Sequence, residues 1–379
     1  HLSLCQINTG KEELVQVVCG APNVREGMMA AWIAPGAIVP ASVHEDAPFV
    51  IGKRKMRGYE SNGMLAGADE LDFGDDHSGI VEIDPEIQPG TPLADVFMLD
   101  DLILEIENKS LTHRPDCFGI IGFAREVAGI LGQEFKEPSI YPEDFILPET
   151  DKSEEPVIKI EDANICRRYS AIVLNKHGEL KKKYLTLEDA LLSKSGMKPI
   201  SPIVDATNYL MLLTGQPLHA FDYDKFVKVG GSDKPIITIR LAKPSEKLVL
   251  LDGNEIELSR DDIVICSNEV PVALAGAMGG ESTMIDENTK NIIIESATFS
   301  LYNLRKTQMQ HGIFTEAITR FTKGQSPNQT MTVATACAQR LAGGFSAVAV
   351  ADAYPQPIKC DKIIKKHIEK YFEKISKNY

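Results

Sequence analysis

The chain has 379 residues and a formal net charge of −14, and 43% of its residues are hydrophobic and 25% charged. This length is more than one hydrophobic core usually organises, so we expect two or three domains of ordinary globular composition rather than a disordered or fibrous protein. No apolar run is long enough to cross a bilayer and the first residues do not form a signal sequence, so we expect no membrane span and a cytoplasmic location.

The cysteines are scattered along the chain and never form a C-x-x-C pair. Their number is odd, which fits reduced thiols better than a disulfide framework or a zinc site. The seven positions are Cys5, Cys19, Cys117, Cys166, Cys266, Cys337 and Cys360.

Acidic side chains are concentrated in residues 1–105, which carry 18 Asp and Glu but only 6 Lys and Arg. Such a surplus repels a phosphate backbone, so any nucleic-acid contact is expected mainly in the later, nearly neutral part of the chain. The exception is a local basic cluster formed by Lys53, Arg54, Lys55 and Arg57. It fits a solvated loop or an RNA contact, and both interpretations stay open.

The segment 1–105 consists of short apolar stretches separated by turns, among them LSLCQI, LVQVVCG and GIVEI. This spacing predicts a small β-barrel. The following segment, 106–136, predicts a helix with Asp116 as its N-cap and Gly132 at its end. His113 and Arg114, at the entry of this helix, are expected to fix a turn rather than to take part in chemistry.

Residues 137–156 are rich in Pro, Glu, Asp and Ser and read as a linker. Residues 157–355 then alternate strand and helix patterns, which predicts a mixed α/β domain. Within it, Asp252 and Gly253 form a hairpin signal between two apolar segments. Residues 361–379 predict an amphipathic helix, and we expect residues 356–379 to begin a following, truncated domain.

The stretch from Ser201 to Asp222 combines an apolar helix pattern with polar side chains. Gly215 and Pro217 are placed to end the helix. His219 and Asp222 follow among apolar neighbours. A lone histidine after such a break is most often a structural residue, so the residues alone do not establish a catalytic role.

Two later features suggest a ligand site. Residues 273–282, ALAGAMGGES, are small enough for backbone to approach a ligand. Glu295 follows the apolar run 292–294, which predicts a buried strand. A carboxylate at the end of such a strand is expected to have a favourable partner, either a ligand or the guanidinium of Arg240 or Arg305. The sequence contains no P-loop, no G-x-G-x-x-G after a strand, no H-E-x-x-H and no G-x-S-x-G.

In chain order, the motifs VDATNYLM, GQPLHAFD, LVLLDG, ALAGAMGGE, IIIESATF and HGIFTEAITRFTKG resemble the editing domain of the beta subunit of bacterial phenylalanyl-tRNA synthetase. The earlier motifs VVCGAPNVREG, PGAIVP, KMRGYESNGML and HRPDCFGIIGFAREVAGILG are similar to the oligonucleotide-binding barrel of the same subunit and to the connector behind it. Together these motifs cover most of residues 1–355.

The resemblance implies a multidomain α+β chain. It places a partial OB-fold, tRNA-binding-like barrel at 1–105, a helical connector left from a small N-terminal domain at 106–136, and an editing domain of B3/B4 type at 157–355. In the family's barrel a strand precedes the segment that starts here at Leu2. We therefore expect a barrel whose first strand is missing.

For the editing domain, the resemblance implies hydrolysis of tyrosine wrongly attached to phenylalanine tRNA, with His219 and Glu295 as the catalytic residues. Glu295 would bind the tyrosine hydroxyl, and His219 would orient the ester or a water molecule, since no Ser-His-Asp or Cys-His arrangement offers a nucleophile. The implied substrate contacts are Thr207, Asn208, Gly279, Thr315 and Ala317. Candidates for phosphate contacts, which could equally form a solvated basic face, are Arg167, Arg168, Lys181, Lys182 and Lys183.

For the whole enzyme, the resemblance implies ATP and magnesium as cofactors, and tRNA(Phe) and a catalytic alpha subunit, in a heterotetramer, as partners. For the present chain we expect no cofactor, no metal and no membrane contact. Two other interpretations stay open: a non-catalytic RNA-binding or subunit-docking module, and a free-standing proofreading hydrolase. The second is weakened by the incomplete barrel.

Overall fold

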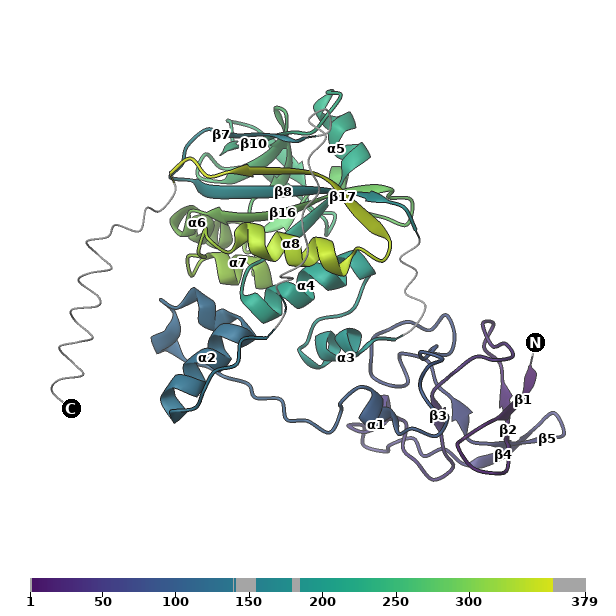
Figure 1. The fold of residues 1–379 in the computed structure, drawn as a ribbon. Coiled ribbons are helices and arrows are strands. Elements are labelled where there is room, and N and C mark those ends of the chain that lie inside the picture. The colour runs from purple at the N-terminus through teal and green to yellow at the C-terminus, as the bar shows by residue number, and fades with distance from the viewer. Residues whose placement is uncertain (1, 139, 141–154, 179–184, 357–379) are drawn as a thin grey trace. The chain divides into compact units, whose positions relative to one another are not determined.

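A computed structural model gives the fold of residues 2–138, 140, 155–178 and 185–356 (Figure 1). The chain has the predicted α+β, multidomain class and divides into two compact units. The first unit is made of residues 1–146, 174–220 and 335–347, and the second of residues 147–173, 221–334 and 348–379.

The β-rich part of the first unit consists of short antiparallel ladders, as the sequence predicts. They pair β1 with β2, β3 with β6, and β4 with β5. Arg57 and Gly58 connect β4 to β5 with φ 48 and 89, the conformation of a tight hairpin turn. The strands are β1 (Ser3–Ile7), β2 (Val15–Cys19), β3 (Trp32–Ile33), β4 (Lys53–Met56), β5 (Tyr59–Asn62) and β6 (Met64–Leu65).

These ladders and the loops after them bury a core of their own. Ile33, Phe73 and Phe97 are at most 6% exposed, and the rings of Phe73 and Phe97 meet edge to face with centroids 5.5 Å apart. Ala190 of helix α3 (Leu187–Lys194) belongs to the same core. Helix α3 therefore packs on a module that precedes it by about a hundred residues in the chain.

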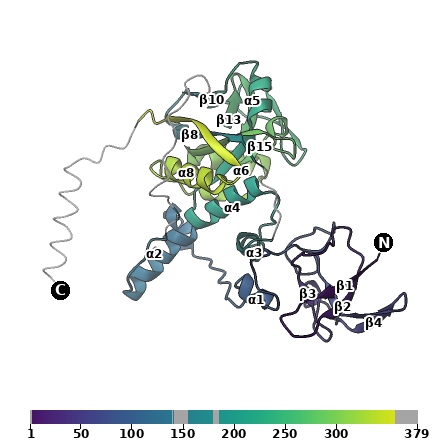
Figure 2. The same cartoon turned by 45° about the vertical axis from the view of Figure 1, so that its right-hand side comes forward.

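Helices α2 and α4 pack against each other in the first unit (Figure 2). Their contact requires a glycine, because a Cβ on Gly119 would lie 2.3 Å from the backbone nitrogen of Gly215. Gly132 and Gly215 end the two helices in the left-handed conformation, which confirms both predicted ends. The helices and 3-10 turns of this unit are α1 (Leu93–Val96), η2 (Lys109–Leu111), η3 (Pro115–Phe118), α2 (Ile120–Leu131), α3 and α4 (Pro202–Thr214), with η1 (Pro40–Ser42) before them.

The predicted N-cap of α2 is wrong. The helix begins after Gly119, and the Asp116 carboxylate binds the Arg114 guanidinium through two hydrogen bonds of 2.9 and 2.7 Å. Arg114 also binds Glu126 at 2.8 Å, which confirms that it fixes the turn at the helix entry.

The second unit is built on two sheets and a hairpin, although the boundary between the two units falls inside β8, β9 and β17, so that His219 on β9 is counted with the first unit. One sheet has the strand order β15-β14-β13-β10-β7 and the other β17-β8-β16-β9. Strands β11 and β12 form the hairpin that Asp252 and Gly253 predict. The strands are β7 (Val157–Ile160), β8 (Cys166–Lys176), β9 (Leu218–Asp222), β10 (Ile236–Leu241), β11 (Lys247–Val249), β12 (Glu255–Glu257), β13 (Ile263–Ser267), β14 (Val270–Leu274), β15 (Met278–Gly279), β16 (Asn291–Phe299) and β17 (Phe345–Ala353).

The main core of this unit joins both sheets with the helices beside them. Strand β8 runs between β10 on one side and α6 on the other in Figures 1 and 2. Ile239, Phe299 and Phe321 are among the buried side chains that fill this core. The helices and the 3-10 turn are α5 (Tyr223–Gly230), η4 (Glu281–Thr283), α6 (Leu301–His311), α7 (Glu316–Phe321) and α8 (Thr330–Arg340).

A polar cluster, in which Ser170 and Thr330 are buried and Asp352 is exposed, ties β17 to β8. The Asp352 carboxylate accepts hydrogen bonds from Arg168 Nε at 2.9 Å, Arg168 Nη2 at 2.8 Å and Ser170 Oγ at 2.7 Å. The Ser170 hydroxyl also lies 3.0 Å from that of Thr330. The bonded partners Arg168 and Asp352 are 184 positions apart in sequence, and Ser170 and Thr330 are 160 apart, so the cluster joins segments from the two ends of the domain's sequence.

Within the described residues, no helix is both long and apolar enough to cross a membrane. The predicted helix at 361–379 lies outside the described residues, and so does most of the predicted linker at 137–156.

Candidate functional site

Glu295 lies on β16 among apolar side chains that face the core. Its alternate neighbours Ile293 and Ala297 belong to this core, and Glu295 itself is 5% exposed. In the part of the chain that the structure describes, its carboxyl group takes part in no hydrogen bond or ion pair. Arg240, one of the two alternative partners, instead binds Glu246 through hydrogen bonds of 2.7 and 2.9 Å.

Burial raises the pKa of Glu295 to about 8, so the carboxyl group is largely protonated at pH 7. On the neighbouring strand β8, burial raises the pKa of Tyr169, and the Glu295 charge raises it further. Among the residues that the structure describes, the buried Tyr169 hydroxyl has no hydrogen-bond partner. Sequence analysis missed Tyr169, because an aromatic residue in an apolar strand pattern carries no sign of a polar neighbour.

The small-residue turn and the start of α7 are joined by Thr315. Its hydroxyl donates to the carbonyl of Ala277 at 2.9 Å and accepts from the backbone nitrogen of Ile318 at 3.2 Å, which caps α7. Gly279 lies two residues beyond Ala277 on β15, where it pairs with Ala273. Ala317 is half-buried in the first turn of α7. Glu295, Gly279, Thr315 and Ala317 therefore belong to one compact unit.

Thr207, Asn208 and His219 belong to the other compact unit. Thr207 is 6% exposed on α4, and its hydroxyl donates to the carbonyl of Val204 at 2.7 Å. Asn208 is half-buried on the same helix. His219 lies on β9, and burial lowers its pKa to about 4, so the imidazole is neutral at pH 7.

The other acidic and imidazole groups that stood out in the sequence have structural partners. Asp222 caps α5 by accepting from Lys225 N at 2.9 Å and also accepts from the Thr289 hydroxyl at 2.7 Å. His311 is the last residue of α6, and its Nε2 lies 2.7 Å from a carboxylate oxygen of the buried Asp262. Both carboxylates are thus used to hold the fold together.

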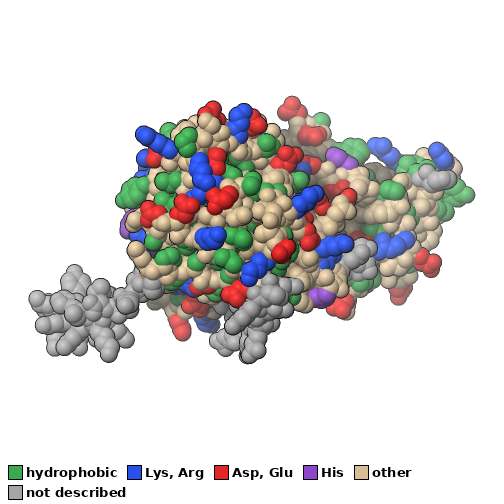
Figure 3. Space-filling view, turned by 90° about the horizontal axis from the view of Figure 1, so that it is seen from above, with side chains coloured by type: hydrophobic (Ala, Val, Ile, Leu, Met, Phe, Trp, Pro, Cys, Tyr) green, Lys and Arg blue, Asp and Glu red, His purple; other side chains and the backbone are tan. Residues whose placement is uncertain are grey.

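The basic residues proposed for phosphate contacts differ in their exposure and in the partners they bind. The Arg168 guanidinium is bound to Asp352 and to the carbonyl of Pro327, so its hydrogen-bonding capacity is used inside the domain. Arg167 is exposed. On the face drawn in Figure 3, Lys and Arg side chains alternate with Asp and Glu and do not gather in one patch. The predicted contacts Lys181, Lys182 and Lys183 lie outside the described residues.

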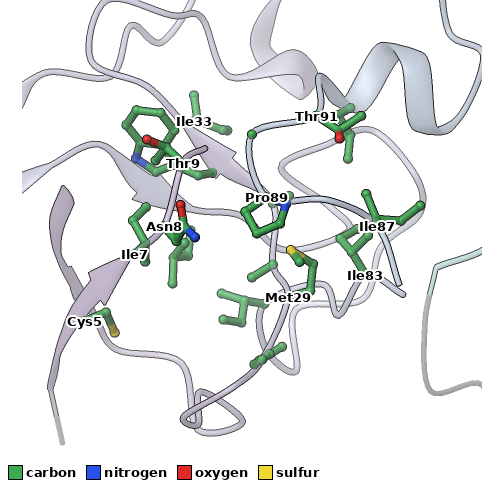
Figure 4. A pocket seen from close by; sticks show the side chains of 18 of the residues that line it. Cys5, Ile7, Asn8, Thr9, Met29, Ile33, Ile83, Ile87, Pro89 and Thr91 are labelled. Carbon is green, nitrogen blue, oxygen red and sulfur yellow. The ribbon is translucent and has the colours of Figure 1, made fainter. Parts of the chain in front are cut away.

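A cavity of about 1280 Å³ lies in the β-rich part of the first unit (Figure 4). Apolar side chains such as Ile7, Met29, Ile33 and Ile83 dominate its lining, and the buried hydroxyl of Thr9 has no hydrogen-bond partner within the described part of the chain. The cavity lies between the β1 ladder and the segment that follows Ile83. Most of its lining is apolar, with Lys11, Arg25 and Glu26 as its charged side chains.

Over the described ranges, no three His, Cys, Asp or Glu side chains are grouped so that they could hold a metal ion. The His311–Asp262 pair does not form a nucleophilic triad, because the nearby Thr307 hydroxyl binds Asp262 and not the imidazole.

Two family models match the chain in sequence order. Residues 1–92 match a putative tRNA binding domain, and residues 165–343 match the B3/4 domain. The second range contains all seven predicted catalytic and substrate-binding residues.

Similar proteins include phenylalanine-tRNA ligase beta subunits. The one from Symbiobacterium thermophilum is 37% identical over 361 residues, which is 94% of this chain and 39% of that protein. The one from Pectobacterium atrosepticum is 37% identical over 327 residues, or 86% of this chain and 38% of that protein. The chain thus spans about two fifths of the length of the curated relatives it matches.

Among solved structures, an N-terminal fragment of the phenylalanyl-tRNA synthetase beta subunit from Pyrococcus horikoshii is 17% identical, with a TM-score of 0.30 over 61% of this chain and 68% of that one. A score this low does not establish a shared fold.

Proposed function

Since the chain belongs to the phenylalanine-tRNA ligase beta-subunit family, we propose that its B3/4 domain hydrolyses the ester of tyrosine wrongly attached to tRNA(Phe). Tyrosine differs from phenylalanine by one hydroxyl, which an apolar pocket rejects only about a hundredfold. A second site that binds the hydroxyl directly can discriminate further. The observation that carries the proposal is Glu295, a buried carboxyl group without a partner in the described fold.

The protonated Glu295 carboxyl suits a phenol as its ligand. It offers one O–H donor and a carbonyl acceptor, and a phenol can accept the first and donate to the second. The ring of phenylalanine can do neither, so binding it would leave the buried group unpaired at a cost of about 1–3 kcal/mol. This cost corresponds to a preference of roughly 5- to 150-fold for tyrosine.

The small residues near the start of α7 would shape the pocket. Gly279 leaves room for an aromatic ring because it has no side chain, and Ala317 presents only a methyl group. Thr315 would form part of the pocket wall without binding the ligand through its hydroxyl, because that hydroxyl already bonds the carbonyl of Ala277 and the backbone nitrogen of Ile318.

The resemblance also assigns His219, Thr207 and Asn208 to this reaction. A histidine with a pKa of about 4 is a weak base at pH 7, so His219 would orient the ester or a water molecule rather than remove its proton. Thr207 and Asn208 would contact the terminal adenosine or the amino acid. Water held by the site and by the ribose hydroxyl of the tRNA would be the nucleophile.

The activity of the whole enzyme is part of the same proposal. Charging of tRNA(Phe) would require ATP and magnesium and the alpha subunit in a heterotetramer, in the cytoplasm. The described residues offer no metal-binding cluster, and the sequence has no P-loop. We therefore assign the use of ATP and magnesium to other parts of the enzyme, and we expect no phenylalanine-dependent pyrophosphate exchange from the present chain.

The test is release of tyrosine from tyrosyl-tRNA(Phe) by the isolated chain, compared with release of phenylalanine from phenylalanyl-tRNA(Phe). Glu295→Ala should lower kcat/KM for the tyrosyl ester roughly tenfold and narrow its advantage over the phenylalanyl ester. Glu287→Ala, which removes an exposed carboxylate outside the proposed pocket, is the matched control. An unchanged ratio in Glu295→Ala would remove Glu295 from the pocket, and no hydrolysis by the wild type would contradict the proposed activity.

A non-catalytic docking function is the second candidate, and exposed apolar side chains favour it. Leu102, Ile103 and Leu104 are 85%, 69% and 76% exposed, and Ile130 and Leu131 on α2 are 74% and 65% exposed. Such surfaces are typical of protein contacts. Binding of mischarged tRNA without turnover would favour this function over hydrolysis.

A further inference from the structure

Tyr169 and Glu295 project from the same face of one sheet. They belong to β8 and β16, which are neighbouring strands in the order β17-β8-β16-β9 (Figure 1). Tyr169 belongs to the main core of the second unit together with Ile293 and Ala297. Since side chains alternate along a strand, Glu295 projects from the same face of β16 as Ile293 and Ala297, and therefore toward this core.

The surroundings of the two residues support this arrangement. Ser170, the next residue of β8, lies on the opposite face, where its hydroxyl donates to Asp352 at 2.7 Å. Burial raises the pKa of both Tyr169 and Cys166, and the Glu295 charge raises it further, which places the carboxyl group close to both side chains. The Cys166 thiol already donates to a backbone carbonyl at 3.4 Å. Of these two neighbours, it is therefore the Tyr169 hydroxyl that keeps an unused donor within the described fold.

Both groups are buried and both have hydrogen-bonding capacity to spare. Neither the Tyr169 hydroxyl nor the Glu295 carboxyl group bonds another described residue. A phenylalanine would fill the position of Tyr169 without burying a hydroxyl, so the hydroxyl destabilises the unliganded fold. The hydroxyls of Ser296 and Thr298 are also buried without a described partner, so one such group does not indicate a site. Tyr169 differs from them because a second unpaired polar group stands beside it on the same face.

The two groups are chemically matched to a single ligand hydroxyl. The raised pKa of Tyr169 keeps its hydroxyl protonated at pH 7, so this group is available as a donor. The protonated Glu295 carboxyl group supplies a carbonyl acceptor beside it. A phenol carries one donor and two acceptor lone pairs, so it can accept from Tyr169 and donate to Glu295 at the same time.

Two hydrogen bonds to one hydroxyl discriminate better than one. A phenylalanyl ligand would leave both Tyr169 and Glu295 buried and unpaired, and it would displace any water that satisfies them without replacing the bonds of that water. Each bond that the ligand hydroxyl gains is expected to favour binding by roughly 3- to 10-fold. The pair therefore suits an aryl ring that carries a hydroxyl better than it suits an unsubstituted ring.

We propose that Tyr169 is a specificity-determining residue of the editing site, which binds the hydroxyl of the tyrosyl ligand together with Glu295. This inference rests on the proposed hydrolysis of tyrosyl-tRNA(Phe) and adds a second partner for the group that distinguishes tyrosine from phenylalanine. Tyr169 takes no part in breaking the ester bond. Its loss therefore changes the preference between the two esters and not the chemistry that they share.

Hydrolysis of tyrosyl-tRNA(Phe) and of phenylalanyl-tRNA(Phe) by the full 379-residue chain tests the proposal. Tyr169→Phe should lower the ratio of the two kcat/KM values roughly 3- to 10-fold by slowing the tyrosyl ester, whereas a general loss of structure would slow both esters equally. Two matched controls should leave the ratio unchanged. Ser296→Ala removes a buried unpaired hydroxyl from the opposite face of β16, and Tyr302→Phe removes a hydroxyl from a side chain that is 74% exposed.

A binding measurement separates this inference from the proposed hydrolysis. Calorimetry uses adenosine that carries tyrosine or phenylalanine through a stable amide link at its ribose, so no ester is cleaved. Tyr169→Phe should weaken binding of the tyrosyl compound roughly 3- to 10-fold and leave that of the phenylalanyl compound unchanged. Because Tyr169 and Glu295 bind the same hydroxyl, the double variant with Glu295→Ala should lose less preference than the product of the two single losses.

The outcomes distinguish the two proposals. Binding preference that depends on Tyr169 without hydrolysis by the wild type would support the hydroxyl site and contradict the hydrolysis. Hydrolysis with the same preference in Tyr169→Phe as in the wild type would overturn the role of Tyr169 alone, and a wild type that neither binds nor hydrolyses would overturn both.

The stability of Tyr169→Phe is a further check. Its Tm should equal or exceed that of the wild type, because the substitution removes a buried hydroxyl without a bond in the described fold. A lower Tm would overturn the proposal, since it would show that the hydroxyl already has a partner in the folded protein.

Discussion

Replacing Glu295 by glutamine should remove a large pH dependence from the stability of the second unit. The Glu295 side chain is 5% exposed, and burial raises its pKa from 4.5 to about 8. The folded protein therefore keeps a proton that the unfolded chain loses in this range. The contribution of this proton to stability is fully present below pH 4.5 and is lost as the pH rises through 8.

The expected magnitude follows from the two pKa values. A rise from 4.5 to about 8 corresponds, at about 1.4 kcal/mol per pH unit, to about 5 kcal/mol between the two ends of the range. Glutamine keeps the shape of the side chain but does not ionise. Because a domain is typically stable by about 5–15 kcal/mol, this difference should be plain in any measurement of unfolding.

Hydrogen exchange of the β16 amides at pH 5, 7 and 9 reports on the free energy of unfolding of this unit. The difference between Glu295→Gln and wild type should grow with pH by several kcal/mol and level off above pH 8. The single tryptophan, Trp32, lies in the other unit, so its fluorescence should show no such difference. The reasoning would be refuted if the stability of Glu295→Gln and of the wild type changed equally with pH, or if Glu281→Gln changed the pH dependence as much as Glu295→Gln does.

Two further substitutions test the packing around the turn and α7. Gly276→Ala should destabilise the second unit by about 2–4 kcal/mol in urea unfolding, because φ is 65 and the new Cβ would lie 2.9 and 3.0 Å from the side chains of Phe321 and Leu304. Gly253→Ala, with φ 82 but open space around its Cβ, should cost only about 1 kcal/mol, and equal costs would contradict the packing argument. Thr315→Val should cost about 1–3 kcal/mol because both hydroxyl bonds are lost, and Thr315→Ser should recover most of it. A fully stable valine variant would show that these bonds do not hold the turn.

Local signals in the sequence predicted local structure well. Gly215 ends α4 and Asp252-Gly253 turns a hairpin because each depends on backbone conformations that few residues adopt. Burial of Glu295 was also predictable, since an apolar run places it inside a strand. Asp116 shows the limit of such signals: its carboxylate could cap a helix, but a guanidinium two residues away binds it instead.

Contacts between residues that are far apart in the chain could not be predicted from the sequence. Arg168 was a candidate for phosphate contacts because it follows another arginine, yet its partner Asp352 is 184 residues away and no periodicity connects them. Tyr169 beside Glu295 is a similar case, because it depends on the pairing of β8 with β16. The roles of His219, Thr207 and Asn208 came from the family resemblance alone, and they remain predictions.

The hydrogen bonds between Asp352 and β8 have a consequence for protein engineering with this domain. The part of the domain that follows the short strand β7 begins with β8 and ends with β17, and these are adjacent strands of one sheet. A domain whose entry and exit lie next to each other can be spliced into a surface loop of a host protein without forcing the ends of that loop apart. The same adjacency makes the domain a good subject for circular permutation, with a short new link from β17 to β8 and new ends at the exposed Gly253 turn.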